Sequence, residues 1–301
     1  MNRRGVALLV VLWVLLVAAT LAIPGAMGGR LGVDASRNRA AAIIAAFEAR
    51  GCASRVLAAI DAEVRAAASD AAKERVWNAL DRSLTESAAA HGCAVALRSG
   101  GARLDVNRAD EAALRRFFGA FVNADAASRL AAAATDWRDA DDDTRPGGAE
   151  AEWYRAAGRP LPSNRPFRAV DEIRLVRGFE AAEVLVGSLS IEEGPIDILH
   201  APLEVLASLP GLGPEGAAEL IARRDAGWRP VEVQELFALA ASAPDGASVD
   251  FLALAQAVQL GATTWVITAT ARDPLGRIER TEEVTIARGE HALVPVRRRV
   301  W

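Results

Sequence analysis

The sequence predicts an α+β fold: a long N-terminal helix packs against a small antiparallel β-sheet, and a large all-α domain is inserted between the strands. Three observations lead to this prediction. An uncharged apolar stretch near the N-terminus continues into an alanine-rich helical pattern. Two pairs of strand-like segments lie far apart in the chain. The residues between these two pairs carry helical and loop patterns almost throughout.

The N-terminus combines a short basic leader, residues 1–5, with an apolar stretch, residues 6–29, that contains no charged side chain. A helix over this stretch would be about 36 Å long, which is enough to cross the hydrocarbon core of a bilayer. Arg3 and Arg4 precede it, and basic residues tend to stay on the cytoplasmic side of a membrane. We therefore expect a single-pass transmembrane helix, with the chain after Arg30 exported.

Three kinds of export signal fit this N-terminus. A cleaved secretory signal would be cut near Gly28, although its apolar part is usually shorter than the one seen here. A plain signal anchor would keep the whole segment. In the third kind, a glycine joins the basic leader directly to the apolar run, as Gly5 does before Val6. The residues alone leave all three open.

Helical patterns continue beyond the apolar stretch. Residues 31–65 are rich in alanine, with Arg, Glu and Ile at helical spacing, and residues 70–90 carry apolar side chains on one face. We expect residues 30–92 to form a stem and its flanking helices. This region holds Cys52, and Cys93 follows it directly. The pair could form one disulfide in an oxidising compartment or remain as two buried thiols.

Strand patterns bracket the central part of the chain. Residues 93–98 and 102–106 predict a hairpin around a Ser-Gly-Gly turn at 99–101. Residues 263–272 and 278–287 predict a second hairpin, because both are rich in β-branched residues and an Asp-Pro-Leu-Gly turn separates them. The predicted sheet therefore comprises residues 93–106 and 263–290, and residues 107–262 form the inserted helical domain.

The insert contains a loose internal duplication. Residues 105–114 parallel residues 197–206, and residues 168–176 parallel residues 229–237. The second copy resembles a helix-hairpin-helix unit, with Gly211 and Gly213 in its turn and Pro214 opening the next helix. Such hairpins hold a phosphate in DNA-binding proteins. A membrane-anchored DNA-binding or uptake protein is therefore the alternative function.

Charge argues against the DNA-binding alternative. Residues 197–260 contain nine acidic residues and three arginines, whereas a phosphate-binding module is normally basic. The whole chain has a net charge of −4. We therefore expect no nucleic-acid partner.

The most distinctive segment is an acidic run from Asp136 to Glu150. It offers carboxylates on a glycine-containing loop, the kind of oxygen donors that Ca²⁺ prefers. The spacing does not match an EF-hand, and a solvated loop whose Asp residues cap helices is the other interpretation. The candidate ligands for a calcium ion are Asp136, Asp139, Asp141, Asp142 and Glu150. Asn164 and Asp171 are candidates for holding the backbone of the loop.

Nothing in the sequence indicates an enzyme. The three histidines have no metal-ligand spacing and no cysteine partners. We find no nucleophile elbow, P-loop or dinucleotide-binding fingerprint. The paired carboxylates all belong to the acidic run, which does not predict two carboxylates facing each other across a cleft.

Two sets of motifs resemble a known family. The junction of Gly5 and Val6 resembles the class III signals of the type IV pilin superfamily. The run DW-x-D-x-D…GAE, followed by NRPF, the segment 171–178 and the segment 201–211, resembles the K family of minor pseudopilins of the type II secretion system. Pilins usually carry Glu at the fifth position after the cut. Val10 stands there, and this absence is a mark of the K family.

The resemblance carries several expectations. Prepilin peptidase would cleave between Gly5 and Val6 and leave Val6 N-methylated. The mature protein would lie in the inner membrane, with most of the chain in the periplasm. It would be a structural tip or initiator subunit of the pseudopilus, which exports folded proteins, with minor pseudopilins I and J as partners. A pilin-like stem and sheet would carry the insert, whose helical domain would bind Ca²⁺.

Overall fold

The computed structural model describes residues 3–89, 93–180, 183–191, 194–241, 250–289 and 292–300. Within these ranges, the side chains of residues 3–10, 19–31, 78, 81–89, 183, 184 and 241 are outside the description. The structure combines helices with a small antiparallel sheet, so the predicted mixed class is confirmed.

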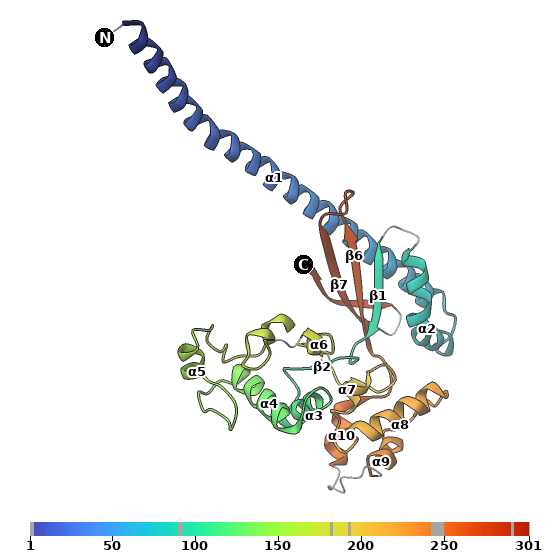
Figure 1. Cartoon of the computed structure of the whole chain (residues 1–301). Helices are drawn as coiled ribbons and strands as arrows, with labels where there is room; N and C mark the ends of the chain where they lie inside the picture. Colours follow the sequence, from blue (N-terminus) through green and yellow to red (C-terminus); the bar gives the residue numbers. More distant parts are fainter. Residues whose placement is uncertain are drawn as a thin grey trace.

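A single long helix organises the N-terminal half. Helix α1 runs from Arg3 to Ala66, and helix α2, Asp70–Ala89, folds back beside its C-terminal part. Figure 1 shows the N-terminal part of α1 projecting away from the rest of the molecule. The C-terminal part packs on the sheet through side chains at helical spacing. Ala49, Cys52, Val56 and Ile60 share a core with the strands, and Ala41 and Ala45 in the preceding turns are also buried.

The sheet has four antiparallel strands in the order β1-β6-β7-β8. These are β1 (Ala94–Ser99), β6 (Thr264–Arg272), β7 (Glu279–Arg288) and β8 (Leu293–Val300). Their inward side chains meet α1 and α2, and the indole rings of Trp77 and Trp265 stack with centroids 4.9 Å apart. Glu282 of β7 is fully buried and pairs with Arg50 of α1 at 3.2 Å and with Arg298 of β8 at 3.3 Å. The ion pairs tie the stem to the edge of the sheet.

The insert contains a second, separate hydrophobic core. Its first half holds α3 (Glu111–Gly119), α4 (Ala124–Arg138), α5 (Ala151–Ala156), the 3-10 helix Val170–Leu175 and α6 (Glu183–Val186). Its second half holds α7 (Leu203–Leu206), α8 (Gly213–Asp225), α9 (Gln234–Ala241) and α10 (Phe251–Ala257). Figure 1 shows the two halves side by side at the end of the molecule farthest from the N-terminus.

Each half of the insert is closed by a short parallel strand pair. In the first half β2 (Leu104–Asp105) pairs with β3 (Leu189–Ser190), and in the second β4 (Ile196–Asp197) pairs with β5 (Val258–Gln259). Asp105 and Asp197 take equivalent places, since each carboxylate accepts a backbone N–H from two residues farther along the chain. The internal duplication in the sequence therefore corresponds to a repeated strand pairing.

The predicted hairpin over residues 93–98 and 102–106 is wrong. Strand β1 pairs with β6, and the following residues pair with β3 instead of returning along β1. The reason lies at Gly101, which has φ +90° and packs against the insert so closely that a Cβ atom would lie 2.9 Å from the backbone nitrogen of Asp197. The chain therefore leaves the sheet at this turn. The sheet also continues past the predicted end at residue 290, because β8 adds a fourth strand.

No helix in the described part of the chain is both long enough and apolar enough to cross a membrane. The span predicted over residues 6–29 lies largely outside the described side chains, since those of residues 6–10 and 19–29 are among the omitted ones. The same holds for Gly5 and Val6. The transmembrane helix and the cleavage site therefore stay predictions.

A disulfide joins Cys52 of α1 to Cys93, directly before β1. It closes a loop with a sequence separation of 41 residues and so restricts the unfolded chain. Closing a loop of this length is worth about 4 kcal/mol in the chain-entropy description.

We expect the double variant Cys52→Ala/Cys93→Ala to be less stable than the disulfide-bonded protein by about this amount, as measured by urea unfolding of both proteins. Equal unfolding midpoints with and without the disulfide would contradict the expectation.

Candidate functional site: the acidic loop between α4 and α5

Helix α4 positions the first two carboxylates of the loop. Asn123 precedes the helix as its N-cap, and its side chain accepts the backbone N–H of Ala126 in the first turn. Asp136 lies in the last turn, fully buried, and Asp139 is the C-terminal cap. The C-terminal end of a helix dipole is negative, so two carboxylates here are destabilising unless a cation compensates them.

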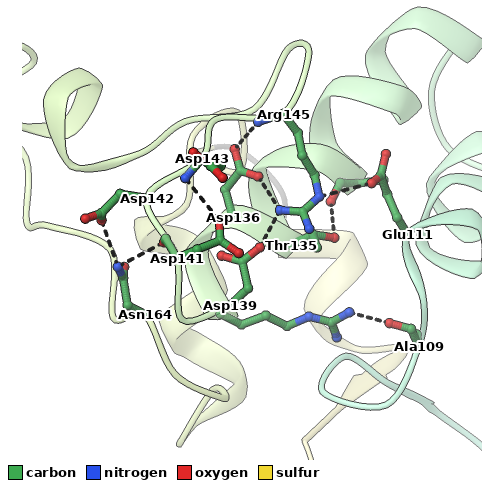
Figure 2. A network of polar contacts seen from close by, with 12 residues as sticks. Ala109, Glu111, Thr135, Asp136, Asp139, Asp141, Asp142, Asp143, Arg145 and Asn164 are labelled. Atoms are coloured by element: carbon green, nitrogen blue, oxygen red, sulfur yellow. Dashed lines mark hydrogen bonds and ion pairs between the residues drawn. The ribbon is translucent and has the colours of Figure 1, made fainter.

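Arg145 supplies that cation. Its Nη1 atom lies 2.9 Å from Oδ1 of Asp136 and also pairs with Asp139, while its Nε atom lies 3.3 Å from Oε2 of Glu111. The backbone N–H of Arg145 donates to the other oxygen of Asp136 at 3.2 Å. Figure 2 shows the guanidinium between these carboxylates. The hydrogen bond with Asp136 is the largest cause that raises the pKa of Arg145 above its usual range.

A glycine pair lets the loop turn back onto Asp136. Gly147 has φ +83°, and the backbone N–H of Gly148 donates to the carbonyl of Arg145 at 2.9 Å. A Cβ atom on Gly148 would collide with the carboxylate of Asp136. The close approach therefore requires glycine at position 148.

Asn164 holds the middle of the loop. Its Nδ2 atom donates to the backbone carbonyl of Asp141 at 3.3 Å and to the carboxylate of Asp142 at 3.1 Å, as Figure 2 shows. Its own backbone N–H donates to the carbonyl of Trp137 at 3.1 Å. Asn164 adopts φ +44°, a conformation that Asn tolerates better than most residues. Asp171 instead pairs with Arg174, at 3.2 Å.

Glu150, the residue before α5, is a buried carboxylate without a hydrogen-bond donor among the described atoms. The residue is 4% exposed, and neither oxygen of its carboxylate has a hydrogen-bond partner among the described atoms. Burial, followed by repulsion from Asp136 and Asp139, raises the pKa of Glu150 to about 7. Burial also raises the pKa of Asp139, against the pairing with Arg145. Oδ1 of Asp139 and Oδ1 of Asn164 likewise have no partner.

Three aromatic side chains, Trp137, Trp153 and Tyr154, pack against one another beside the loop. Trp137 and Tyr154 are buried and meet edge to face at 5.2 Å, and the indole N–H of Trp137 donates to Glu172 at 3.2 Å. Arg177 lies over the ring of Trp153 at 4.9 Å and donates to the carbonyl of Gly148 at 2.9 Å. Asn107 fixes the neighbouring chain segments, since its side chain bonds the backbone of Phe167 and of Ile191.

The structure brings the predicted ligands to one loop but not into a formed metal shell. Asp136 and Asp139 share Arg145, while Asn164 contacts the carboxylate of Asp142 and the backbone of Asp141. In the portion of the chain that the structure describes, no group of three His, Cys, Asp or Glu residues has an arrangement that could hold a metal ion. The oxygens without partners are nevertheless hard donors that fit a calcium ion.

Sequence reasoning missed the basic partners of the loop. Arg145 and Arg177 decide its shape, and neither was a candidate. The signal for Arg145 was present, because this arginine follows the aspartate run after one threonine, Thr144, and directly precedes Pro-Gly-Gly. The sequence alone does not show which carboxylates lie beside Arg145, so it is equally consistent with a solvent-exposed arginine.

Residues 78–186, which contain the acidic loop, match the family model described as "Type II secretion system (T2SS), protein K". The resemblance to protein K is confirmed. A chain in the crystal structure of the GspK-GspI-GspJ complex from the enterotoxigenic Escherichia coli type 2 secretion system is similar at 19% sequence identity, with a TM-score of 0.49. The similarity covers 69% of this chain and 79% of that one. A search of curated proteins finds no match.

The pKa of Glu150 predicts that the stability of the insert depends on pH. Because the folded state holds this proton more tightly than the unfolded chain, stability falls as the pH rises from the unfolded value of 4.5 through about 7. The full effect is of the order of 3 kcal/mol. In a calcium chelator, Glu150→Gln should therefore unfold at a higher temperature than the unaltered protein at pH 8 and at a similar temperature at pH 4.5.

The exposed neighbour Glu152 provides the control, since Glu152→Gln changes the same charge outside the loop. We expect that variant to follow the unaltered protein at both pH values. If Glu150→Gln were destabilising at pH 8 in the chelator, the carboxylate would have a partner that the structure does not contain.

Proposed function

We propose that the protein is a minor pseudopilin of the type II secretion system, a structural tip or initiator subunit of the periplasmic pseudopilus. The observation that carries the proposal is the combination of a protein K domain with a long N-terminal helix that extends beyond the body of the molecule. Such a subunit acts by assembling with others. It needs no catalytic residues, and we propose none.

The projecting part of α1 is suited to lipid or to other helices. Its described side chains Val11 to Leu16 are between 55% and 68% exposed, Trp13 the most. An apolar surface of this kind is unfavourable in water, and a bilayer removes the cost. We propose that residues 6–29 span the inner membrane once, with the sheet and the insert in the periplasm.

Processing by prepilin peptidase belongs to the same proposal. Cleavage after Gly5 would remove Arg3 and Arg4 and leave Val6 as an N-methylated terminus. The fifth mature residue would then be Val10. A carboxylate in lipid persists only when it is paired, and a subunit with no neighbour above it has no partner to offer.

The exposed face of the stem supports assembly with partner helices, for which minor pseudopilins I and J are the expected partners. Phe47 is 67% exposed on the side of α1 away from the sheet, and Ile43 and Ile44 of the preceding turn are also exposed. Ala46, directly before Phe47, is only partly buried, and its small side chain allows close helix approach. The insert lies at the far end of the molecule, where it would block further subunits from stacking (Figure 1).

A calcium ion would stabilise the acidic loop. The unpartnered oxygens of Asp139, Glu150 and Asn164 would hold it, with Asp136, Asp141 and Asp142 as further candidates. The ion would compensate the buried charge of Glu150 and link α4 to α5.

The DNA-binding alternative has less support. Gly211 and Gly213 both have positive φ angles, as a tight hairpin requires, and α8 follows directly. However, residues 197–260 have three times as many acidic residues as arginines, and a phosphate would be repelled. The hairpin serves the packing of the insert, because Leu209 and Leu212 within it are buried.

Processing predicts a definite mass. The protein isolated from native membranes should lack residues 1–5 and carry one additional methyl group on Val6, as measured by intact mass spectrometry. A protein that retains the leader, or one cut near Gly28, would contradict the proposal and favour an anchor or a secreted protein.

The stem surface predicts a binding defect. Phe47→Glu should strongly reduce co-purification with minor pseudopilins I and J, because it places a charge on the proposed helix interface. Val231→Glu is the matched control, since Val231 is an exposed apolar residue on the insert. Equal recovery of the partners with both variants would exclude Phe47 from the interface.

A further inference from the structure

The acidic loop carries its own counter-ion. Arg145 contacts carboxylates from three parts of the insert: Glu111 at the start of α3, Asp136 in the last turn of α4, and Asp139 at its end. The side chain of Arg145 is 32% exposed, so the guanidinium is partly desolvated while it makes these contacts. Figure 2 shows it bridging the two helices.

This arrangement places one positive charge beside two of the five candidate calcium ligands. Asp136 and Asp139 lie at the negative end of the dipole of α4, and without a cation their charges would repel each other and the helix end. Arg145 offsets part of that repulsion. It also closes the loop, because its backbone N–H donates to Asp136. The loop therefore has a folded form that does not depend on a metal.

One guanidinium does not satisfy the whole loop. Among the atoms that the structure describes, both oxygens of Glu150, which is 4% exposed, and Oδ1 of Asp139 have no donor. Asp139 is thus shared, since Arg145 holds Oδ2 and leaves Oδ1 unpaired. A divalent cation bound by Asp139 and Glu150 would lie close to the guanidinium, and two positive charges at that separation repel.

We propose that Arg145 is an internal competitor of Ca²⁺ at the acidic loop. Binding of the metal requires Arg145 to release Asp139, or both Asp136 and Asp139, so the guanidinium lowers the affinity for the ion while keeping the empty loop ordered. The proposal rests on the calcium site of the proposed function and concerns how that site is regulated. Removal of the guanidinium makes binding tighter and makes the order of the loop depend on the metal.

The test compares Arg145→Gln with the unaltered full chain in detergent. Calcium chloride is titrated by calorimetry, and thermal unfolding is followed in chelator and in excess Ca²⁺. We expect the dissociation constant for Ca²⁺ to fall at least about tenfold in Arg145→Gln. We also expect its unfolding temperature to be lower than normal in chelator and to rise more on addition of Ca²⁺. Arg155→Gln is the matched control, because Arg155 is exposed on α5.

Each outcome decides one question. If the unaltered protein binds Ca²⁺ and Arg145→Gln binds it with equal or lower affinity, the competitor role is wrong and the metal site stands. If only Arg145→Gln binds, competition is complete. If neither binds at millimolar Ca²⁺, both the metal site and the competition are wrong, while the pseudopilin assignment is tested separately by processing and partner binding.

A second variant covers the case in which Arg145→Gln does not fold. Arg145→Lys keeps the positive charge but loses the planar guanidinium that reaches several carboxylates at once. Competition predicts that Arg145→Lys binds Ca²⁺ more tightly than the unaltered protein does. Where Arg145→Gln can also be measured, the affinity of Arg145→Lys should lie between those of the other two proteins. An affinity at or below the unaltered value would overturn the proposal.

Discussion

The rest of the structure depends on the burial of one face of α1 against the sheet. Ala45, Ala49 and Ala53 are completely buried there, so the helix backbone lies close to β6 and β7. Side chains larger than alanine would separate the two layers. The same contact decides which part of α1 is free, because the residues before Ala41 have no sheet beneath them. The C-terminal part of α1 is therefore a core element, whereas almost all the described side chains before Ala41 are exposed. The boundary lies where the buried alanines end.

The second constraint is the polar junction between the sheet and the insert. Asp197 is fully buried and accepts hydrogen bonds from the hydroxyl of Ser99 and the backbone N–H of Leu199, and it contacts Nδ1 of His200 at 2.7 Å. Gln259 donates to the carbonyl of Gly100 at 2.6 Å. A buried carboxylate with several partners holds one geometry, since any displacement would leave it unpaired. Two hydrophobic cores that share no continuous packing are thereby kept in a defined orientation.

Elements with a strong periodic signal could be predicted from the sequence, and elements defined by a distant partner could not. Helices α1 and α2 and the hairpin of β6 and β7 follow from alanine spacing and from β-branched alternation. Strand β2 pairs with a segment far along the chain, which no local pattern reveals, and Pro295 with three successive arginines disguises β8. In the acidic loop the carboxylates were evident from their types. Arg145 and Asn107 were not assigned roles, because their importance comes from which carbonyls and carboxylates the fold places beside them.

The way the insert joins the sheet has a consequence for the history of the chain. Ser99 at the end of β1 is the register partner of Trp265 near the start of β6, and the backbone N–H of Gly100 donates to the carbonyl of Thr264 at 2.7 Å. Two antiparallel neighbours whose ends meet in this way could be connected by a tight turn of a few residues. The whole helical domain therefore occupies the place of a hairpin loop. A smaller ancestor with a continuous β1–β6 hairpin could have gained the domain at this point without any change in strand order, and the sheet would have tolerated the insertion because entry and exit already lay side by side.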